Sequence, residues 1–145
     1  MFYGVYQHNI DDKGRLVLPN KFRLELQEGA MITKGFDGCL QIYTRESWNA
    51  IRAEAKSKPF TSQTVRDFIR VVIGNASDVM LDKAGRLNIP TNLLKLAGIA
   101  KEVTIVGLDE TIEIWSTEKW EAKESANEEA FEANAEQLSF LGRGN

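Results

Sequence analysis

Short apolar runs separated by polar turns make up the chain, and their order in the first half returns in the second. The strands expected from these runs cover residues 2–10, 15–18, 30–34, 39–43, 79–81, 86–89, 102–106 and 111–115. Each of these runs is short, and an isolated hairpin is barely stable in water. The pattern therefore predicts strands from both halves that bury one shared apolar face.

Two prolines mark the places where strands give way to short helices. Pro19 and Pro90 lack the N–H that a sheet needs, but proline fits the first turn of a helix. We expect helices over 20–26 and 91–97, with Gly98 as the end cap of the second.

Helical spacing of apolar residues predicts three longer helices. Two follow the first hairpin, with Pro59 between them and Gly74 at the end of the second. The third covers 117–138. Thr44 and Ser116 are suitable N-caps for the helices that follow each hairpin.

A nine-residue segment occurs twice, at 11–19 and at 82–90. Five of its residues recur 71 positions later: Asp11, Gly14, Arg15, Leu16 and Pro19 return as Asp82, Gly85, Arg86, Leu87 and Pro90. A repeat this long is not a solenoid unit, whose period is about 20–50 residues. Two copies instead predict two halves of one closed structure, related by an approximate two-fold axis. We expect a mainly β, α+β fold, with one repeat and its helical extension over 1–74 and a second repeat with a helical tail over 75–145.

The distribution of charge separates one segment from the rest of the chain. The 145 residues carry 18 basic and 21 acidic side chains, a net charge of −3. Residues 118–136 hold seven glutamates and two lysines, whereas the remainder holds 16 basic and 14 acidic residues. Because local potential decides which partner approaches a given face, the overall acidity does not exclude nucleic acid. The plainer interpretation is that these glutamates form a solvated helix face.

The sequence predicts a cytoplasmic protein without membrane contact. No apolar run approaches the length of about 18–20 residues that spans a bilayer, and the first residues lack the pattern of a signal peptide. Cys39 is the only cysteine, so no internal disulfide can form.

The residues of common catalytic sites are scarce. His8 and Cys39 occur once each, so a nucleophile–histidine arrangement would depend on these single copies. No cluster has zinc-ligand spacing, and no glycine-rich loop matches a phosphate-binding pattern. Asp11 and Asp82 could form a carboxylate pair, but each has a turn role available and an arginine four residues on. We therefore expect no enzymatic activity, no metal, no cofactor and no small-molecule substrate.

Arg15 and Arg86 each follow a glycine at the start of a strand. The guanidinium group is a planar fork of five donors that fits a phosphate or the O6/N7 edge of guanine. One interpretation makes the two arginines a DNA-contacting face. The other confines each to an ion pair with Asp11 or Asp82 that pins its turn. Nearby basic residues make the first copy the more cationic: Lys13, Lys21 and Arg23 correspond to Ala84, Asn92 and Leu94.

Taken with the rest of the chain, these motifs resemble those of the MraZ family. The resemblance rests on the two Asp-x-x-Gly-Arg-Leu segments with their prolines, the opening Met-Phe-x-Gly, the hairpin 34–40 and the helix around Trp48. It covers nearly the whole chain, to about residue 140. It implies a duplicated swapped-hairpin β-barrel like that of AbrB and SpoVT, with pseudo-two-fold symmetry and flanking helices. AbrB and SpoVT build the barrel from two chains, and here the two repeats would build it within one.

The resemblance also implies a function. Members of the family are bacterial transcriptional regulators that bind short direct repeats in double-stranded DNA upstream of the division and cell-wall gene cluster, which includes their own gene. They assemble into ring-shaped homo-oligomers in the nucleoid-associated cytoplasm. The DNA contacts would be Arg15 and Arg86, with Lys13 and Lys83 beside them. The turns would be shaped by Asp11, Gly14, Asp82 and Gly85.

Two other functions stay open. An oligomeric protein-binding scaffold or antitoxin-like adaptor is favoured by the acidic C-terminal helix with Trp120 and Phe131. A small barrel enzyme would have to use Asp11 and Asp82.

Overall fold

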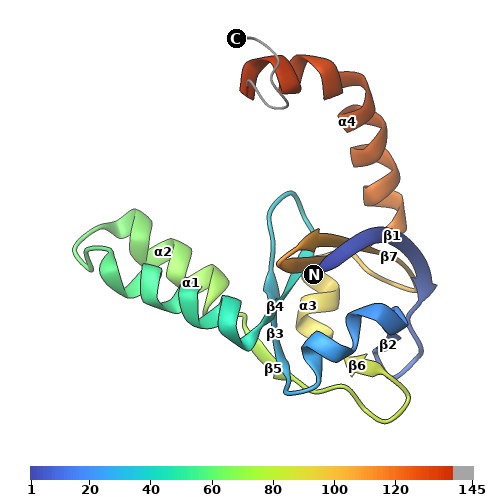
Figure 1. Cartoon of the computed structure of the whole chain (residues 1–145). Coiled ribbons are helices and arrows are strands. Elements are labelled where there is room, and N and C mark those ends of the chain that lie inside the picture. The colour runs from blue at the N-terminus through green and yellow to red at the C-terminus, as the bar shows by residue number, and fades with distance from the viewer. Residues whose placement is uncertain (139–145) are drawn as a thin grey trace.

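The computed structural model describes residues 1–138, and Figure 1 shows their arrangement. The strands are β1 (Phe2–Asn9), β2 (Arg15–Val17), β3 (Ala30–Lys34), β4 (Leu40–Thr44), β5 (Ser77–Val79), β6 (Arg86–Asn88), β7 (Glu102–Asp109) and β8 (Thr111–Ser116). The α-helices are α1 (Arg45–Ser57), α2 (Gln63–Val72), α3 (Thr91–Leu96) and α4 (Thr117–Leu138). Two short 3₁₀ turns, η1 (Asn20–Phe22) and η2 (Leu24–Leu26), follow β2.

Six strands form one sheet and two form a separate ribbon. The sheet order is β1-β7-β8-β4-β3-β5, and β2 pairs with β6. Exchanging the two halves turns β1 into β5, β3 into β7 and β4 into β8, which gives the same order read from the other end. The first strand of each half therefore pairs with the hairpin of the other half. The predicted mainly β fold, duplicated and flanked by helices, is confirmed.

Corresponding residues of the two halves fill a common core. Leu16 and Leu87 face each other in the ribbon and are 0% and 1% exposed. Leu18 with Ile89 and Phe22 with Leu93 are further buried pairs at the same spacing of the repeat. Full burial of such a side chain contributes about 1.5–3 kcal/mol. Neither half could cover this apolar surface alone.

The strand predicted over 79–81 lies two residues earlier. Its position is set by its partner, because Ser77, Asp78 and Val79 pair with Ile32, Met31 and Ala30 of β3. Met80 then leaves the sheet and is largely exposed. The register of a partner strand is not visible in the local sequence.

Strand β7 is longer than the predicted 102–106. It continues to Asp109 because β1 pairs with it along its whole length, with Phe2 opposite Asp109. The turn predicted over 107–110 is correspondingly shorter, since Leu108 already pairs with Thr111.

The segment 20–26 forms two 3₁₀ turns rather than one helix. Phe22 N–H donates to Pro19 O at 2.9 Å and Leu26 N–H to Arg23 O at 3.1 Å, both across three residues. Phe22 and Leu26 are buried, and short 3₁₀ turns are a common connector where a chain must bury side chains over few residues.

The six-stranded sheet and the ribbon together form the body of the molecule, called the barrel below. Helices α1 and α2 stand out from it as a helical hairpin (Figure 1). The Thr44 hydroxyl caps α1 by accepting from Ser47 N–H at 3.1 Å. The Ser62 hydroxyl caps α2 by accepting from Val65 N–H at 3.3 Å. The predicted pair of helices on either side of Pro59, and the Thr44 cap, are confirmed.

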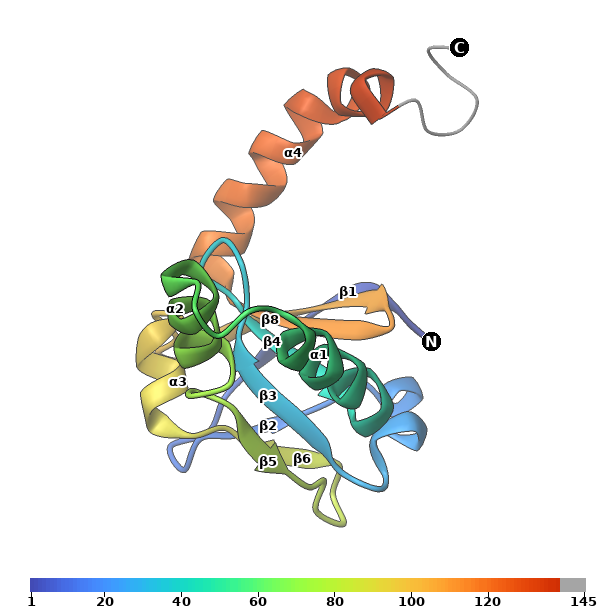
Figure 2. The same cartoon turned by 90° about the vertical axis from the view of Figure 1, so that its left-hand side faces the viewer.

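Helix α4 begins against the barrel and then projects from it. The Ser116 hydroxyl accepts from Lys119 N–H at 3.2 Å, and Trp120 packs on Trp115 with ring centroids 5.5 Å apart. Farther along, Phe131 is 62% exposed. Figures 1 and 2 both show α4 leaving on the side away from β2 and β6. None of the helices within residues 1–138 has the length and hydropathy of a membrane-spanning segment.

Candidate nucleic-acid interface

The two copies of the repeated motif meet in the β2–β6 ribbon. Leu16 pairs with Leu87, Arg15 with Asn88, and Val17 with Arg86. Because side chains alternate between the faces of a strand, the buried leucines point inward. The outward face carries Arg15, Val17, Arg86 and Asn88.

Arg15 and Arg86 are diagonal neighbours on this outward face. Residues in this relation have Cα atoms about 7–8 Å apart, and both arginine side chains are partly exposed, at 32% and 33%. The duplication therefore brings the two guanidinium groups to one surface.

Each arginine is held by the aspartate of its own turn. Asp11 Oδ1 accepts from the backbone N–H groups of Lys13 at 3.0 Å and Arg15 at 2.8 Å. Asp11 Oδ2 accepts from Arg15 Nε at 2.7 Å. Gly14, with a φ of 78°, supplies the positive backbone angle that the turn requires.

The second turn repeats this geometry. Asp82 Oδ1 accepts from Ala84 N–H and Arg86 N–H, both at 2.9 Å. Asp82 Oδ2 accepts from Arg86 Nε at 2.7 Å, and Gly85 has a φ of 79°. The predicted ion pairs are therefore present. They occupy only the Nε side of each guanidinium, so the terminal nitrogens have no recorded partner within residues 1–138.

The electrostatics of the turns argue against acid–base catalysis. The pKa values of Asp11 and Asp82 are lowered, chiefly by the hydrogen bonds from the backbone N–H groups of Arg15 and Arg86. A general acid at neutral pH needs the opposite shift. Both carboxylates stay ionised and serve to orient the guanidinium groups.

Arg23 lies in a different place from the one its sequence position suggests. Along the chain it is nearest the first turn, but it contacts the second, since a Cβ added to Gly85 would lie 2.3 Å from Arg23 Nε. Its Nε–H also donates to Leu18 O at 3.1 Å. The equivalent Leu94 lies against Gly14 in the same manner. The swapped arrangement carries each segment across to the other half's turn, which the linear repeat does not reveal.

Lys13 and Lys83 lie in the two turns and are exposed. Lys13 follows Asp12 in the first turn, and Lys83 follows Asp82 directly in the second, so they are not equivalent positions of the repeat. The structure brings both near the ribbon. Their part in binding stays a prediction.

The unique histidine and cysteine do not form a reactive pair. His8 is half-buried in β1. Cys39 is 1% exposed, and burial raises the pKa of its thiol to about 12. A thiol in this state is a poor nucleophile. Within residues 1–138 no group of three or more His, Cys, Asp or Glu side chains could hold a metal ion.

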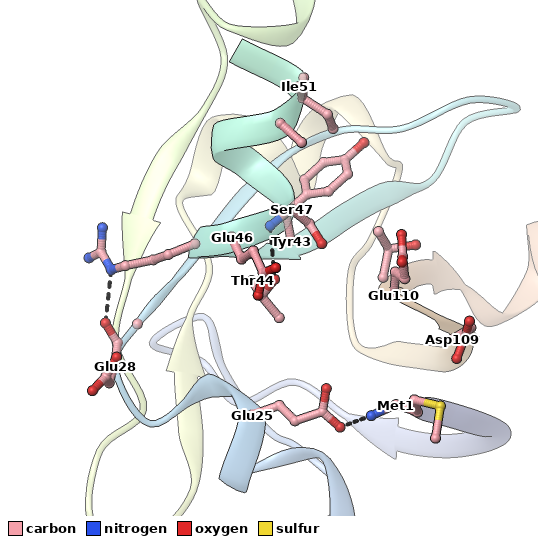
Figure 3. Close-up of a pocket in the computed structure, with 14 residues that line it drawn as sticks. Met1, Glu25, Glu28, Tyr43, Thr44, Glu46, Ser47, Ile51, Asp109 and Glu110 are labelled. Carbon is pink, nitrogen blue, oxygen red and sulfur yellow. Dashed lines mark hydrogen bonds and ion pairs between the residues drawn. The ribbon is translucent and has the colours of Figure 1, made fainter. Parts of the chain in front are cut away.

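A polar hollow of about 660 Å³ lies between η2, the β4–α1 junction and the β7–β8 turn. Figure 3 shows its acidic lining: Glu25, Glu28, Glu46, Asp109 and Glu110. The Met1 amino group pairs with Glu25, and Arg45 Nε–H donates to Glu28 O at 2.8 Å. None of its lining residues belongs to the ribbon or its turns. Its negative charge would repel a phosphate backbone, so it does not extend the candidate interface.

Comparisons with known proteins agree with this duplicated architecture. A family model described as "MraZ protein, putative antitoxin-like" matches the chain twice, over residues 1–71 and 72–140. Transcriptional regulator MraZ of Acetivibrio thermocellus is 43% identical over 142 residues, which cover 98% of this chain and 99% of that protein. The protein of the same name from Clostridium tetani is 44% identical with the same coverage. These names describe regulators, in agreement with the expectation that the chain is not an enzyme. Its sequence, matched along nearly its full length, shows that the chain belongs to the MraZ family.

Proposed function

We propose that this chain is a bacterial transcriptional regulator that binds double-stranded DNA through the β2–β6 ribbon. The observation that carries the proposal is the placement of Arg15 and Arg86 on one outward face, each bonded to its aspartate through Nε alone. The major groove of B-DNA admits a two-stranded β-ribbon, and arginine is the commonest partner of guanine there. The relatives' name supports a role in transcription.

The uneven charge of the molecule supports this orientation. Helix α4 carries the seven glutamates of 118–136 and leaves the barrel away from β2 and β6 (Figure 2). A duplex approaching the ribbon therefore meets the arginines and the lysines of the turns before it meets the acidic helix. Local field rather than net charge governs such an encounter.

We further propose that the subunits form a ring whose ribbons engage successive direct repeats. One ribbon offers few cations, so a single contact should be weak and sensitive to salt. Several ribbons at a fixed spacing convert weak contacts into avidity. The resemblance to the family implies that this DNA lies upstream of the division and cell-wall gene cluster, which includes the protein's own gene. A ring bound there would lie in the nucleoid-associated cytoplasm.

The surface best suited to join neighbours is an apolar groove of about 820 Å³ between α1, α2 and the β3–β4 turn. Its lining includes Phe36 and Phe68, which are 71% and 50% exposed and stack with ring centroids 6.5 Å apart. Its charged lining residues are Lys34 and Lys58 with Asp37, Glu54 and Asp67, so a partner would be held there by apolar contact rather than by opposite charge. We assign the groove to α4 of a neighbouring copy, whose exposed Phe131 supplies an apolar side chain for it.

Replacing Phe68 by glutamate should dissociate the oligomer, because it places a carboxylate in the apolar groove against the glutamates of α4. Light scattering coupled to size-exclusion chromatography measures the change in mass. Phe60→Glu is the matched control, since Phe60 is 83% exposed and does not line the groove. A Phe68→Glu protein that keeps the mass of the wild type would contradict the assignment.

We propose that Arg23, which lies beside the second turn, contacts one phosphate of the bound DNA. Arg23→Leu should then reduce the salt dependence of DNA binding while leaving the fold intact. The second half already has leucine at this position, so the replacement is sterically acceptable. Loss of one phosphate contact lowers the slope of log K against log salt by about 0.9 per engaged subunit. Binding titrations at several salt concentrations measure the slope. Arg23→Lys keeps the charge and should keep the slope. If the slope is unchanged in Arg23→Leu, Arg23 makes no phosphate contact and only packs against Gly85.

The direct test of the proposed function is a footprint of the purified protein on the DNA upstream of its own gene, beside a mobility-shift titration with scrambled DNA. Protection at regularly spaced elements supports the proposal. Equal affinity for both DNAs would contradict it and favour the protein-binding alternative. That alternative is supported by the apolar groove and by the antitoxin-like description of the family.

A further inference from the structure

The outward face of the ribbon breaks the two-fold symmetry of the fold at one pair of positions. Arg15 and Arg86 are equivalent in the repeat and chemically identical. Val17 and Asn88 are also equivalent but chemically different. The register places Asn88 opposite Arg15 and Val17 opposite Arg86. One end of the ribbon therefore presents an arginine with an asparagine, and the other an arginine with a valine.

These side chains are available to a ligand. Val17 is 37% exposed and Asn88 is exposed. Asn88 leans toward the first turn, since a Cβ on Gly14 would lie 3.4 Å from its Oδ1. The amide has no recorded hydrogen-bond partner within residues 1–138, so its donor and acceptor are free for another molecule. Opposed residues have Cβ atoms about 4.5–5.5 Å apart, which is close enough for their side chains to contact neighbouring base pairs.

The chemistry of the two ends selects different bases. Asparagine can bond the N6 and N7 atoms of adenine, whereas an apolar side chain packs on the C5-methyl group of thymine. Arginine at either end prefers guanine. A ribbon with true two-fold symmetry would read an element identically in both directions. This ribbon has a direction.

We propose that Val17 and Asn88 are specificity-determining residues that give the DNA element of each subunit its polarity. Asn88 selects adenine beside the guanine bound by Arg15, and Val17 selects thymine beside the guanine bound by Arg86. The inference rests on the proposed DNA-binding function. It would account for the proposed recognition of direct rather than inverted repeats, because all subunits of a ring must then meet elements that point the same way.

The test compares four full-length proteins: wild type, Val17→Asn, Asn88→Val and the double exchange. Each is used to select binding elements from a library of random duplexes. Wild type should select an asymmetric element. Asn88→Val should reduce discrimination for adenine by about tenfold, and Val17→Asn should do the same for thymine. The double exchange should restore both preferences and select the same duplex as wild type, because a half-turn of the pseudo-symmetric ribbon brings each base back to its matching side chain.

A second measurement isolates the methyl contact. Replacing the selected thymine by uracil removes only its C5-methyl group. This should weaken binding of wild type and Asn88→Val but leave Val17→Asn unaffected. A purely structural role for Val17 would give the same ratio of thymine to uracil affinity in all four proteins. Thermal melting of each variant establishes that the fold is retained.

The outcomes separate this inference from the function on which it rests. If wild type selects an element and the two single exchanges leave its discrimination for adenine and thymine unchanged, the assignment of Val17 and Asn88 is wrong while DNA binding stands. If wild type selects no element, both fail. Loss of the matching preference in each single exchange, with recovery of both in the double exchange, supports both.

Discussion

Replacing Arg15 by alanine is expected to abolish binding to the direct repeats without unfolding the protein. The turn survives because Asp11 Oδ1 still accepts from the backbone N–H groups of Lys13 and Arg15. Only the side-chain contact between Asp11 Oδ2 and Arg15 Nε is removed. A bidentate contact to guanine discriminates by about 1–3 kcal/mol, and the loss occurs in every subunit that engages the DNA. The affinity for an array of repeats should therefore fall by at least about 100-fold.

The measurement is a mobility-shift titration, with circular dichroism and light scattering to establish that fold and mass are unchanged. Arg86→Ala should give a comparable loss, since Arg86 is held by Asp82 in the same geometry. Arg15→Lys keeps the charge but not the planar fork, so it should retain non-specific binding and lose preference for the repeats. Wild-type affinity in Arg15→Ala would show that the ribbon is not the DNA-reading surface.

Replacing Leu18 by aspartate is expected to unfold the chain. Leu18 is 0% exposed, and its N–H donates to Gly85 O at 3.0 Å across the two halves. An unpaired carboxylate at this place costs several kcal/mol of desolvation in addition to the lost apolar contact. The free energy of unfolding of a native protein is about 5–15 kcal/mol. The substitution therefore removes a large part of the stability.

Thermal melting followed by circular dichroism measures this effect. Val17→Asp is the matched control, because Val17 is the adjacent residue and lies on the outward face. It should melt close to wild type. If Leu18→Asp melted as wild type does, the inward face of the ribbon would be assigned wrongly.

The order of strands and turns could be predicted from the sequence because it depends on local chemistry. Gly14 and Gly85 accept positive φ, and Pro19 and Pro90 cannot continue a ladder. The repetition of these signals indicated that two halves form one structure. The limits of β5 and β7 could not be found in this way, because each is set by the strand that pairs with it. The 3₁₀ turns at 20–26 likewise depend on where Phe22 and Leu26 must be buried.

The local contacts of the candidate site were predictable from the sequence, as the order of strands and turns was. A spacing of four residues between Asp11 and Arg15 was enough to expect their ion pair. The contact of Arg23 with Gly85 was not, because it joins residues of different halves that lie together only after the hairpins are exchanged. The pairing of Val17 with Arg86 also depends on cross-strand register. Which residues of the two halves meet is set by tertiary pairing and not by residue type.

Because β1 completes the sheet of the second half and β5 that of the first, the connection at 73–76 has little part in holding the molecule together. Four strand pairings, β1–β7, β2–β6, β3–β5 and β4–β8, cross between the halves. A protease that severed this connection would leave two fragments interlocked as a complementing pair. An ancestor encoded as a single half could have assembled in the same way as a homodimer, with gene fusion adding only the freedom for the copies to diverge, as Val17 and Asn88 have done.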